Sequence, residues 1–420
     1  MPLGDSEDGR GPVPGGDGDR TRAADGADGP VEVLVLPDYR EANPYQRELE
    51  AALEDRDVAV RTATGPGLLA PITRTLLDGG VPDVVHLHFF STYVVTDNRT
   101  VGALGLRAPV TLLLGVRLLI ELALARALGA RLVWTAHDLL NHERRAVRVE
   151  VAIKHVAVRF LLDRVIVHCA RADDLLVDTY RLPDAVREKF VVVPHGHFAD
   201  AYPNGVDRST ARERLGLPTD ATVLCYFGIV RPYKNVPLLI ETFGRLDDDD
   251  ARLLVVGNPR SEALETAVRE RARTDDRVET VLEFVPDDEI QHYLTAADAV
   301  VVPFETDERT LLTSGSVLLA MSFGRAVIAP RLGCVAETVD GRGGFLYEST
   351  RGDELREAME RALDDGSDLD AMGAHSRERI RRCDWGWIAE RTREVYLGRT
   401  PDRPATAAGR RSSEPASSPE

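Results

Sequence analysis

The chain has 420 residues, 43% of them hydrophobic, which is enough for two ordinary domains with sizeable cores. Its net charge of −17 disfavours nucleic acid or an anionic membrane as a partner for the surface as a whole. Lysine occurs only as Lys154, Lys189 and Lys234, and arginine supplies nearly all the remaining positive charge. An acidic, lysine-poor surface is typical of a high-salt, halophile-like cytoplasm, although GC-rich coding also favours arginine over lysine.

The cysteines and the apolar runs indicate the cellular compartment. Cys169, Cys225, Cys334 and Cys383 have no metal-like spacing, which predicts reduced cytosolic thiols rather than a disulfide framework or a zinc site. The N-terminus is acidic and glycine-rich and lacks the apolar core of a signal peptide. The most apolar long run, residues 110–128, contains three charged residues, which favours a buried or interfacial helix over a membrane span.

In chain order, residues 1–30 are mainly Gly, Asp and Pro and are expected to be disordered, as is the tail at 400–420. In the first half, apolar strands are expected at 31–36, 58–61, 84–87, 131–135 and 164–168, with helical patterns such as 45–53 and 72–77 between them. Strands that are apolar almost throughout and alternate with helices predict a parallel sheet covered on both faces.

A strand is expected at 191–193, before a loop near residues 195–205. The alternation continues after this loop, with strands expected at 221–227, 252–256, 278–282, 299–302 and 326–328. We therefore predict an α/β protein with two facing, doubly wound Rossmann-like domains, at 31–198 and 199–384, separated by a cleft. A last helix within 385–399 holds Trp385, Trp387 and Tyr396, which are large enough to pack it back onto the fold.

Basic residues follow the first strand of the second domain. Gly228 permits a sharp exit from that strand, and Arg231 and Lys234 lie beyond its carboxyl end, where ligands bind in open α/β sheets. The planar donors of arginine and the mobile charge of lysine suit a diphosphate. The alternative is a pair of solvated loop charges. The scarcity of lysine and the position at the sheet edge favour phosphate binding.

A second anion-binding element is expected at Ser314, Gly315 and Ser316, which precede a helix predicted at 317–323. The unpaired N–H groups of a first helical turn and the helix dipole attract negative charge, and small side chains let a phosphate approach. The simpler alternative is that Ser314 only caps the helix. Because this helix start belongs on the same sheet edge as the basic residues, anion binding is favoured.

Several histidines lie near strand ends. His137 follows the strand at 131–135 and could bond a sugar hydroxyl or a leaving oxygen, although a histidine satisfied within its loop is equally compatible. His86 and His88 alternate along one strand and are expected to face opposite sides, so that they share no metal ion. We expect His88 at the ligand edge of the sheet and His86 packed inside. For His195 and His197, at the domain junction, a structural role is favoured.

Motifs along most of residues 31–398 resemble a known family. They are VVHLHFF, WTAHDLL and VVVPHGHF in the first half, and FGIVRPYKNVPLLIETF, LLVVGNP, FVPDDEIQHYLTAADAVVVPF, LLAMSFGRAVIAP and GGFLYE in the second. Through them the chain resembles GT-B glycosyltransferases of the family 4 type, the glycosyl transferases group 1 proteins. The resemblance implies a nucleotide-sugar donor held mainly by the second domain and an acceptor held by the first, so that His88 is the acceptor-side candidate. It also implies retention at the anomeric carbon and no bound metal or other cofactor.

The family's functional residues transfer unevenly. Lys234 matches the diphosphate lysine, and His137 matches the first-domain histidine that contacts the transferring sugar. The family's arginine directly follows the glycine, where this chain has Ile229. Arg231, two residues later, is expected to substitute for it. The family's paired glutamates are both missing here and align with Leu311 and Leu319. In the family, the glutamate at the Leu319 position usually supplies a carboxylate to the donor ribose. Serine hydroxyls and backbone N–H groups between these positions are therefore expected to carry donor binding.

The sequence thus predicts a hexosyltransferase acting from a nucleoside diphosphate sugar onto a hydroxyl of a glycan, polysaccharide or glycolipid. We expect it in the cytoplasm, with the inner face of the membrane as a second location, because the helix at 110–128 and the segment 144–164 could contact a bilayer. A core helix explains the same apolar face more simply. Two alternatives remain open: a non-catalytic subunit of this fold that binds a sugar nucleotide or partner, and a nucleotide-sugar epimerase, against which the lack of clear carboxylate pairs counts.

Overall fold

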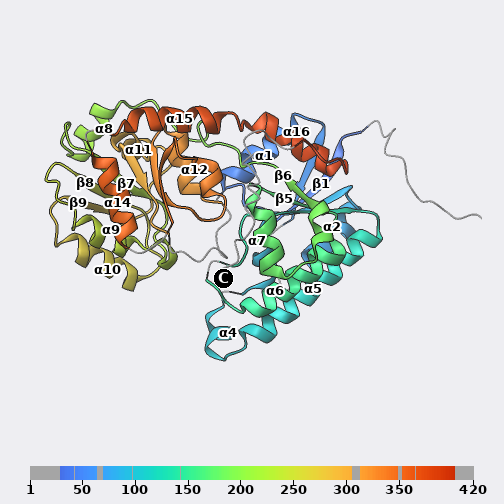
Figure 1. The fold of residues 1–420 in the computed structure, drawn as a ribbon. Coiled ribbons are helices and arrows are strands. Elements are labelled where there is room, and N and C mark those ends of the chain that lie inside the picture. Colours follow the sequence, from blue (N-terminus) through green and yellow to red (C-terminus); the bar gives the residue numbers. More distant parts are fainter. Residues whose placement is uncertain are drawn as a thin grey trace, which may run out of the picture.

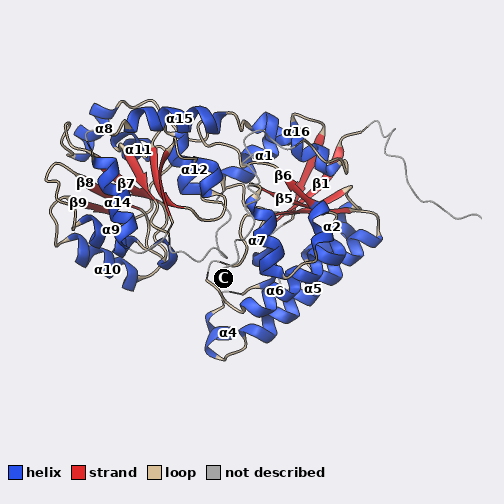
Figure 2. Cartoon of the chain, in the orientation of Figure 1, coloured by secondary structure: helices blue, strands red, loops and turns tan. Residues whose placement is uncertain are grey.

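The structure is a computed structural model, and it describes residues 29–402 except 42, 64–69, 97, 142, 305–312, 349–351 and 365. The described chain forms two α/β domains beside each other, each with a parallel sheet between helices (Figures 1 and 2). This is the predicted fold class. The predicted tails lie almost entirely outside the described residues, and so does Leu311.

The first domain is built on six parallel strands in the order β2-β1-β3-β4-β5-β6. They are β1 (Val31–Leu36), β2 (Val58–Thr62), β3 (Val84–Leu87), β4 (Arg131–Thr135), β5 (Arg164–Val167) and β6 (Phe190–Val192). Their central residues are apolar and buried, because helices cover both faces of the sheet. The chain runs from β1 out to β2 and then returns to β3 on the other side of β1. The carboxyl ends of β1 and β3 therefore flank the point where the strand order reverses, which is where such sheets bind ligands.

The second sheet has the order β12-β11-β10-β7-β8-β9. Its strands are β7 (Val223–Phe227), β8 (Arg252–Val256), β9 (Val278–Val281), β10 (Ala299–Val301), β11 (Ala326–Pro330) and β12 (Gly344–Tyr347). Sequence patterns did not predict β12, which is short and begins at a glycine. A Cβ at Gly344 would lie 1.9 Å from the Val327 carbonyl oxygen, so glycine is what lets β12 pair with β11.

Helices cover both faces of each sheet (Figure 2). Those of the first domain are α1 (Pro44–Glu54), α2 (Pro71–Gly79), α3 (Phe90–Val94), α4 (Arg99–Ala103), α5 (Arg107–Ala127), α6 (Val147–Val156), η1 (Ala157–Leu161), α7 (Arg171–Tyr180) and η2 (Asp184–Lys189). Those of the second are α8 (Arg208–Leu215), η3 (Pro232–Lys234), α9 (Val236–Phe243), α10 (Glu262–Ala272), α11 (Ile290–Ala296), α12 (Gly315–Ser322), α13 (Val335–Val339), α14 (Gly352–Leu363) and α15 (Leu369–Arg381).

The last helix, α16 (Trp385–Tyr396), leaves the second domain and packs against α1 of the first (Figure 1). Its two ends are tied to residues near the cleft. The Trp385 indole N–H donates to the His197 carbonyl oxygen at 2.8 Å. The Tyr396 hydroxyl lies 2.7 Å from Nδ1 of His86, which is buried beneath the first sheet's ligand edge. The C-terminal helix therefore helps to hold the two domains at one relative position.

Helix α5 contains the long apolar run. By length and composition it could cross a membrane, and within the described residues it is the one helix for which this holds. It packs against α2, α3 and α6, and Leu118, Leu122 and Ala125 on one side belong to the first-domain core. Only a third of its most apolar window is buried, so the other side is left to solvent.

The prediction of four reduced thiols is wrong for one pair. Cys169, which follows β5, forms a disulfide with Cys334, which precedes α13, and the bond joins the two domains. Their separation of 165 residues gave no sign of this, because the pairing arises from a tertiary contact between domains. Beside it, the Glu337 carboxylate of the second domain accepts hydrogen bonds from two backbone N–H groups at the start of α7. Cys225 and Cys383 are free and buried.

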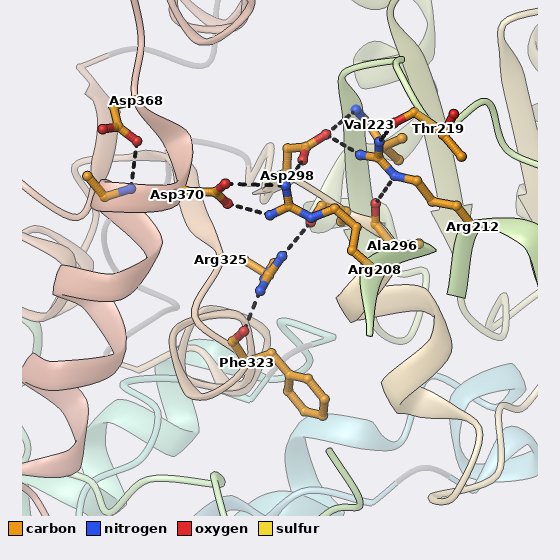
Figure 3. A network of polar contacts seen from close by, with 12 residues as sticks. Arg208, Arg212, Thr219, Val223, Ala296, Asp298, Phe323, Arg325, Asp368 and Asp370 are labelled. Atoms are coloured by element: carbon orange, nitrogen blue, oxygen red, sulfur yellow. Dashed lines mark hydrogen bonds and ion pairs between the residues drawn. The ribbon is translucent and has the colours of Figure 1, made fainter. Parts of the chain in front are cut away.

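A charged network stabilises the second domain at the edge where its strands begin, opposite the ligand edge (Figure 3). The Asp298 carboxylate accepts from Arg212 Nη2 at 2.6 Å and from the Val223 backbone N–H at 2.7 Å. Arg212 is buried and also donates to two backbone carbonyls. Arg208 bridges Asp298 and Asp370 of α15. This network joins α8, β7, β10 and α15.

Candidate active site

Three predicted donor-binding residues meet at the carboxyl end of β7. Gly228 follows this strand with φ of 136°, a conformation that favours glycine. A Cβ at this position would lie 2.7 Å from Ser316 Oγ and 3.2 Å from Lys234 Nζ. Lys234 Nζ itself lies 3.4 Å from Ser316 Oγ. The missing side chain of Gly228 therefore leaves room for an ammonium group and a hydroxyl at one point.

Ser314 and Gly315 begin α12 beside this point, so the helix starts two residues earlier than predicted. Ser314 is buried, and its Oγ accepts a hydrogen bond from the Val317 backbone N–H at 3.4 Å. Ser314 therefore does cap the helix, as the simpler alternative held. Capping uses one N–H of the first turn and is compatible with an anion at the others.

A cavity of about 210 Å³ lies between the domains at this helix start, and we call it the donor cavity. Both domains contribute side chains to its wall. They are Tyr233, Lys234, Phe304, Thr313, Ser314 and Gly315 from the second domain, and Asn43, Tyr45, His137, Asp138, His195 and Phe198 from the first.

Lys234 is the cation of the donor cavity. Burial, and next the nearby positive charge of Arg231, lower the pKa of Lys234 from 10.5 to about 8. Its Nζ lies 5.8 Å from the centre of the Phe304 ring, and among the described residues no carboxylate forms an ion pair with it. The site thus holds a positive charge that burial disfavours and that an anionic ligand would stabilise.

Arg231 lies apart from the other predicted diphosphate residues. Its Nη1 is 3.8 Å from Glu143 Oε1 of the first domain, so the pair bridges the cleft. Arg231 lines a second cavity and not the donor cavity. Its position is close enough to shift the pKa of Lys234 but does not place the guanidinium beside Ser316.

The second cavity, about 310 Å³, is walled mainly by the first domain, and we call it the acceptor cavity. Its wall comes from the segments after β3 and β4, together with two arginines of the second domain. The residues are Tyr39, His88, Phe89, Phe90, Ser91, Thr92, Val95, Trp134, His137, Asp138, Leu140, Asn141, Glu143, Lys154, Arg231 and Arg260. His137 and Asp138 line both cavities, so the two cavities meet at the carboxyl end of β4.

A buried ion pair supports the loop that carries His137. Lys154 Nζ lies 2.9 Å from Glu150 Oε1, and both side chains are fully buried. The ammonium also donates to the Leu139 carbonyl at 2.8 Å, and the carboxylate accepts from the Asn141 side-chain amide at 2.5 Å. Because the pair bonds the residues directly after Asp138, it fixes the loop between the two cavities. Breaking one partner of such a pair leaves an uncompensated buried charge.

The prediction that His86 and His88 face opposite sides is wrong. Their ring centres lie only 4.1 Å apart. Strand β3 ends at Leu87, so the alternation of side chains does not extend to His88. His86 packs inside as predicted, with Nε2 2.8 Å from the Thr135 hydroxyl. His88 lies at the acceptor cavity.

Three imidazoles form a hydrogen-bonded row. His168 Nδ1 lies 2.9 Å from the Val193 carbonyl oxygen, His168 Nε2 lies 3.3 Å from His137 Nδ1, and His137 Nε2 lies 3.3 Å from His88 Nδ1. A carbonyl can only accept, so His168 carries its proton on Nδ1. If each ring is neutral, His137 and His88 must then also be protonated on Nδ1. His88 Nε2 is the terminal acceptor and has no partner among the described residues.

Burial keeps this row of rings neutral. It lowers the pKa of His168 to about 4 and holds the pKa values of His88 and His137 well below 6.5, with neighbouring histidines lowering them further. His195, which packs on Tyr45 with ring centres 4.5 Å apart, has a pKa lowered to about 3. Near neutral pH the site therefore offers neutral imidazoles with fixed tautomers.

Three residues of this site were not predicted from the sequence. His168 directly follows β5, and His137 follows β4 after one intervening residue, so the sheet-edge argument applied to His137 could have found His168. For His195 a structural role was favoured, yet this residue lines the donor cavity. Asp138 was not chosen as a site residue, although it follows His137 directly and lines both cavities.

The sequence and fold match known glycosyltransferases. The model of the glycosyl transferases group 1 family matches residues 221–365. The GDP-mannose:glycolipid 4-beta-D-mannosyltransferase of Xanthomonas campestris pv. campestris is 28% identical over 312 residues, which cover 73% of this chain and 76% of that protein.

Two solved structures share the fold. The sucrose-phosphate synthase of Thermosynechococcus elongatus has a TM-score of 0.65 at 19% identity, covering 87% of this chain and 98% of that one. Anabaena HepE in complex with UDP-glucose has a TM-score of 0.63 at 16% identity, covering 87% and 99%.

The two facing Rossmann-like domains and these matches define the chain as a GT-B glycosyltransferase. The match at residues 221–365 agrees with the resemblance of its second-domain motifs to the glycosyl transferases group 1 proteins. It is accordingly an enzyme of sugar transfer.

Proposed function

We propose that the enzyme transfers a hexose from a nucleoside diphosphate sugar to a hydroxyl of a glycan or lipid-linked acceptor. The observation that carries this proposal is the meeting of the donor and acceptor cavities at His137 and Asp138. A sugar placed at this junction would contact a donor phosphate on one side and an acceptor hydroxyl on the other. Holding the two substrates in this way supplies much of the rate enhancement of a transferase.

The second domain stabilises the leaving group. Departure of a nucleoside diphosphate builds negative charge on its phosphates, and Lys234, Ser316 and the first turn of α12 lie together where that charge would form. In this proposal Arg231 reaches the diphosphate from the acceptor side. These groups supply the positive charge without a bound metal. Activity should therefore persist in EDTA.

His137 orients the transferring sugar. Both of its nitrogens have imidazole partners at 3.3 Å, which is long for a hydrogen bond. A sugar hydroxyl that reaches the cavity junction can replace His88 at His137 Nε2, because catalytic hydrogen bonds often tighten only with substrate bound. His88, at the wall of the acceptor cavity, then bonds the acceptor.

We propose retention of the anomeric configuration, which the family resemblance implies. The acceptor hydroxyl then attacks from the face that the diphosphate leaves, and its proton passes to a leaving phosphate oxygen. One observation favours inversion as a second candidate: the Asp138 carboxylate lines both cavities and could accept the hydroxyl proton as a general base. The Xanthomonas relative is named for a beta-mannoside product, so the outcome needs a direct measurement.

The test is a donor screen read by product mass. GDP-mannose, UDP-glucose and other nucleotide sugars are incubated with wild-type enzyme and with glycolipid or polysaccharide extracts as acceptors, with and without EDTA. The expected result is a hexose mass added to one acceptor class in both conditions. NMR of the purified product then gives its anomeric configuration, and Asp138→Asn should abolish transfer only if the product is inverted. Hydrolysis of donors without transfer to any acceptor would contradict the proposal.

A further inference from the structure

One side of α5 presents large apolar residues to solvent. Leu118, Leu122 and Ala125 point into the first-domain core, whereas Leu113 is 66% exposed and Ile120 63% exposed. The exposed residues recur at helical spacing along the side turned away from the core: Leu112, Leu113, Val116, Ile120 and Leu124. Single exposed apolar residues are ordinary, but a continuous row indicates a contact surface.

Further exposed apolar residues lie on the segments next to α5. Leu104 and Leu106 precede the helix and Leu128 follows it, while Val156 ends α6 and Phe160, 60% exposed, lies on η1. Helix α5 packs beside α6 and η1, and Figure 1 shows α4, α5 and α6 together at one extremity of the first domain. We call these exposed residues of α5, its flanks, α6 and η1 the apolar face.

The charge of this region is opposite to that of the whole chain. Residues 99–161 contain ten Lys and Arg residues and four Asp and Glu residues, in a chain whose net charge is −17. Two of the four acids, Glu121 and Glu150, are buried. Arg144, Arg148 and Arg159 are exposed. Exposed arginines on α6 and η1, which pack beside α5, and on the loop before α6 match a surface that is apolar inside and anionic outside.

The elements under the apolar face also wall the acceptor cavity. Helix α3, which packs against α5, contributes Phe90, Ser91 and Thr92 to that cavity. The loop before α6 contributes Asn141 and Glu143. An acceptor whose lipid stayed in a bilayer at the apolar face would therefore have its head group near this cavity.

We infer that the apolar face docks on the surface of an anionic bilayer, with α5 lying in the plane of the interface. The helix does not need to cross the membrane, since its other side is part of the first-domain core. Docking would place the head group of a lipid-linked acceptor near the acceptor cavity, and in this respect the inference rests on the proposed function. Membrane binding itself requires no catalysis.

Co-sedimentation of the full-length protein with vesicles tests the inference. Wild type should bind phosphatidylcholine vesicles that contain phosphatidylglycerol and bind pure phosphatidylcholine vesicles much more weakly. Leu113→Gln with Ile120→Gln should weaken binding by at least about tenfold, because two side chains no longer enter the apolar layer. Arg144→Gln with Arg148→Gln should cause a loss of about tenfold or more on anionic vesicles alone.

A matched control removes an equally exposed apolar residue elsewhere. Phe284 of the second domain is 73% exposed, and Phe284→Gln should leave vesicle binding unchanged. Lack of wild-type binding to anionic vesicles would overturn the inference. A second outcome would also overturn it. If light scattering shows that wild type is a dimer, and the Leu113 and Ile120 substitutions dissociate this dimer without changing vesicle binding, then a second copy of the chain covers the apolar face.

Activity separates this inference from the proposed function. The Leu113 and Ile120 double variant should transfer normally to a water-soluble acceptor and poorly to the same head group embedded in vesicles. If wild type binds vesicles but transfers to neither acceptor, the proposed function fails and the docking surface stands. If the double variant is equally active on both acceptors, docking has no part in acceptor delivery and the inference fails.

Discussion

Replacing Lys234 by Met tests the donor cavity most directly, because methionine keeps the length of the side chain and removes its charge. Burial and Arg231 lower the pKa of Lys234 from 10.5 to about 8, which corresponds to roughly 3 kcal/mol against the charged form in the free enzyme. An anionic diphosphate beside Nζ would reverse this penalty. The lysine is therefore expected to act chiefly on the bound, charged donor and its transition state.

The expected loss follows from one charge-assisted contact. Such a contact contributes about 1.5–3 kcal/mol, so kcat/KM for the donor should fall by roughly ten- to more than a hundredfold in Lys234→Met. The free variant should be at least as stable as wild type in thermal unfolding, because a buried cation without an ion-pair partner among the described residues has been removed.

The same side chain predicts a pH dependence. Only charged Lys234 binds the diphosphate well, and its pKa of about 8 means that most of the free enzyme is charged at pH 7 and roughly a tenth at pH 9. Donor KM of wild type should therefore rise as pH increases through about 8, and this rise should be absent in Lys234→Met.

A second Lys-to-Met change serves as the control. Lys189 donates to three backbone carbonyls at the end of η1, away from both cavities. Lys189→Met should lower thermal stability and leave donor KM unchanged. If Lys234→Met retains nearly full kcat/KM for a donor that wild type turns over, the assignment of Lys234 to the diphosphate is refuted.

Three further substitutions test other parts of the structure. His168→Phe removes the acceptor for His137 Nδ1–H and should lower kcat about tenfold with little change in donor KM, whereas His168→Gln, whose amide oxygen can still accept, should restore part of the rate. Asp298→Asn leaves the buried Arg212 without its carboxylate and should reduce the free energy of unfolding by about 2–4 kcal/mol in urea titration, while activity of the folded enzyme is unaffected. Cys169→Ser should melt at a lower temperature than oxidised wild type and at nearly the same temperature as reduced wild type. If oxidised wild type melts at the same temperature as the variant, the inter-domain disulfide is contradicted.

The fold could be read from the sequence because its strands are short apolar runs between helical patterns. This signal found both sheets and failed only at β12, where a glycine start and four residues give little periodicity. The same sheet-edge rule placed Gly228, Lys234 and Ser316 near one another, and the structure brings these three together. Their role in donor binding stays a prediction.

Contacts between distant segments could not be read in this way. The disulfide of Cys169 and Cys334 depends on how two domains meet, which no local pattern encodes. The relation of His86 to His88 depended on whether β3 continued past Leu87, and strand ends are poorly fixed by sequence. Arg231 was grouped with Lys234 because both follow the same strand end, yet the loop turns the Arg231 guanidinium toward Glu143 in the other domain.

The first turn of α12 leads to a last prediction, about the ribose of the donor. The family resemblance implies a ribose-binding carboxylate at Leu319, but this leucine is buried in a core cluster with Val317 and Leu318. Helix α12 therefore offers no carboxylate to the ribose. Lys234 and the start of α12 would contact the donor's phosphates and not its sugar hydroxyls. A 2′-deoxynucleoside diphosphate sugar should then be used with kcat/KM within about threefold of the ribonucleoside donor. A charge-assisted hydrogen bond to the ribose would instead make the deoxy donor at least roughly tenfold worse. Competition between the two donors, followed by mass spectrometry, gives the ratio directly, and a ratio of tenfold or more would show that another group of this chain holds the ribose.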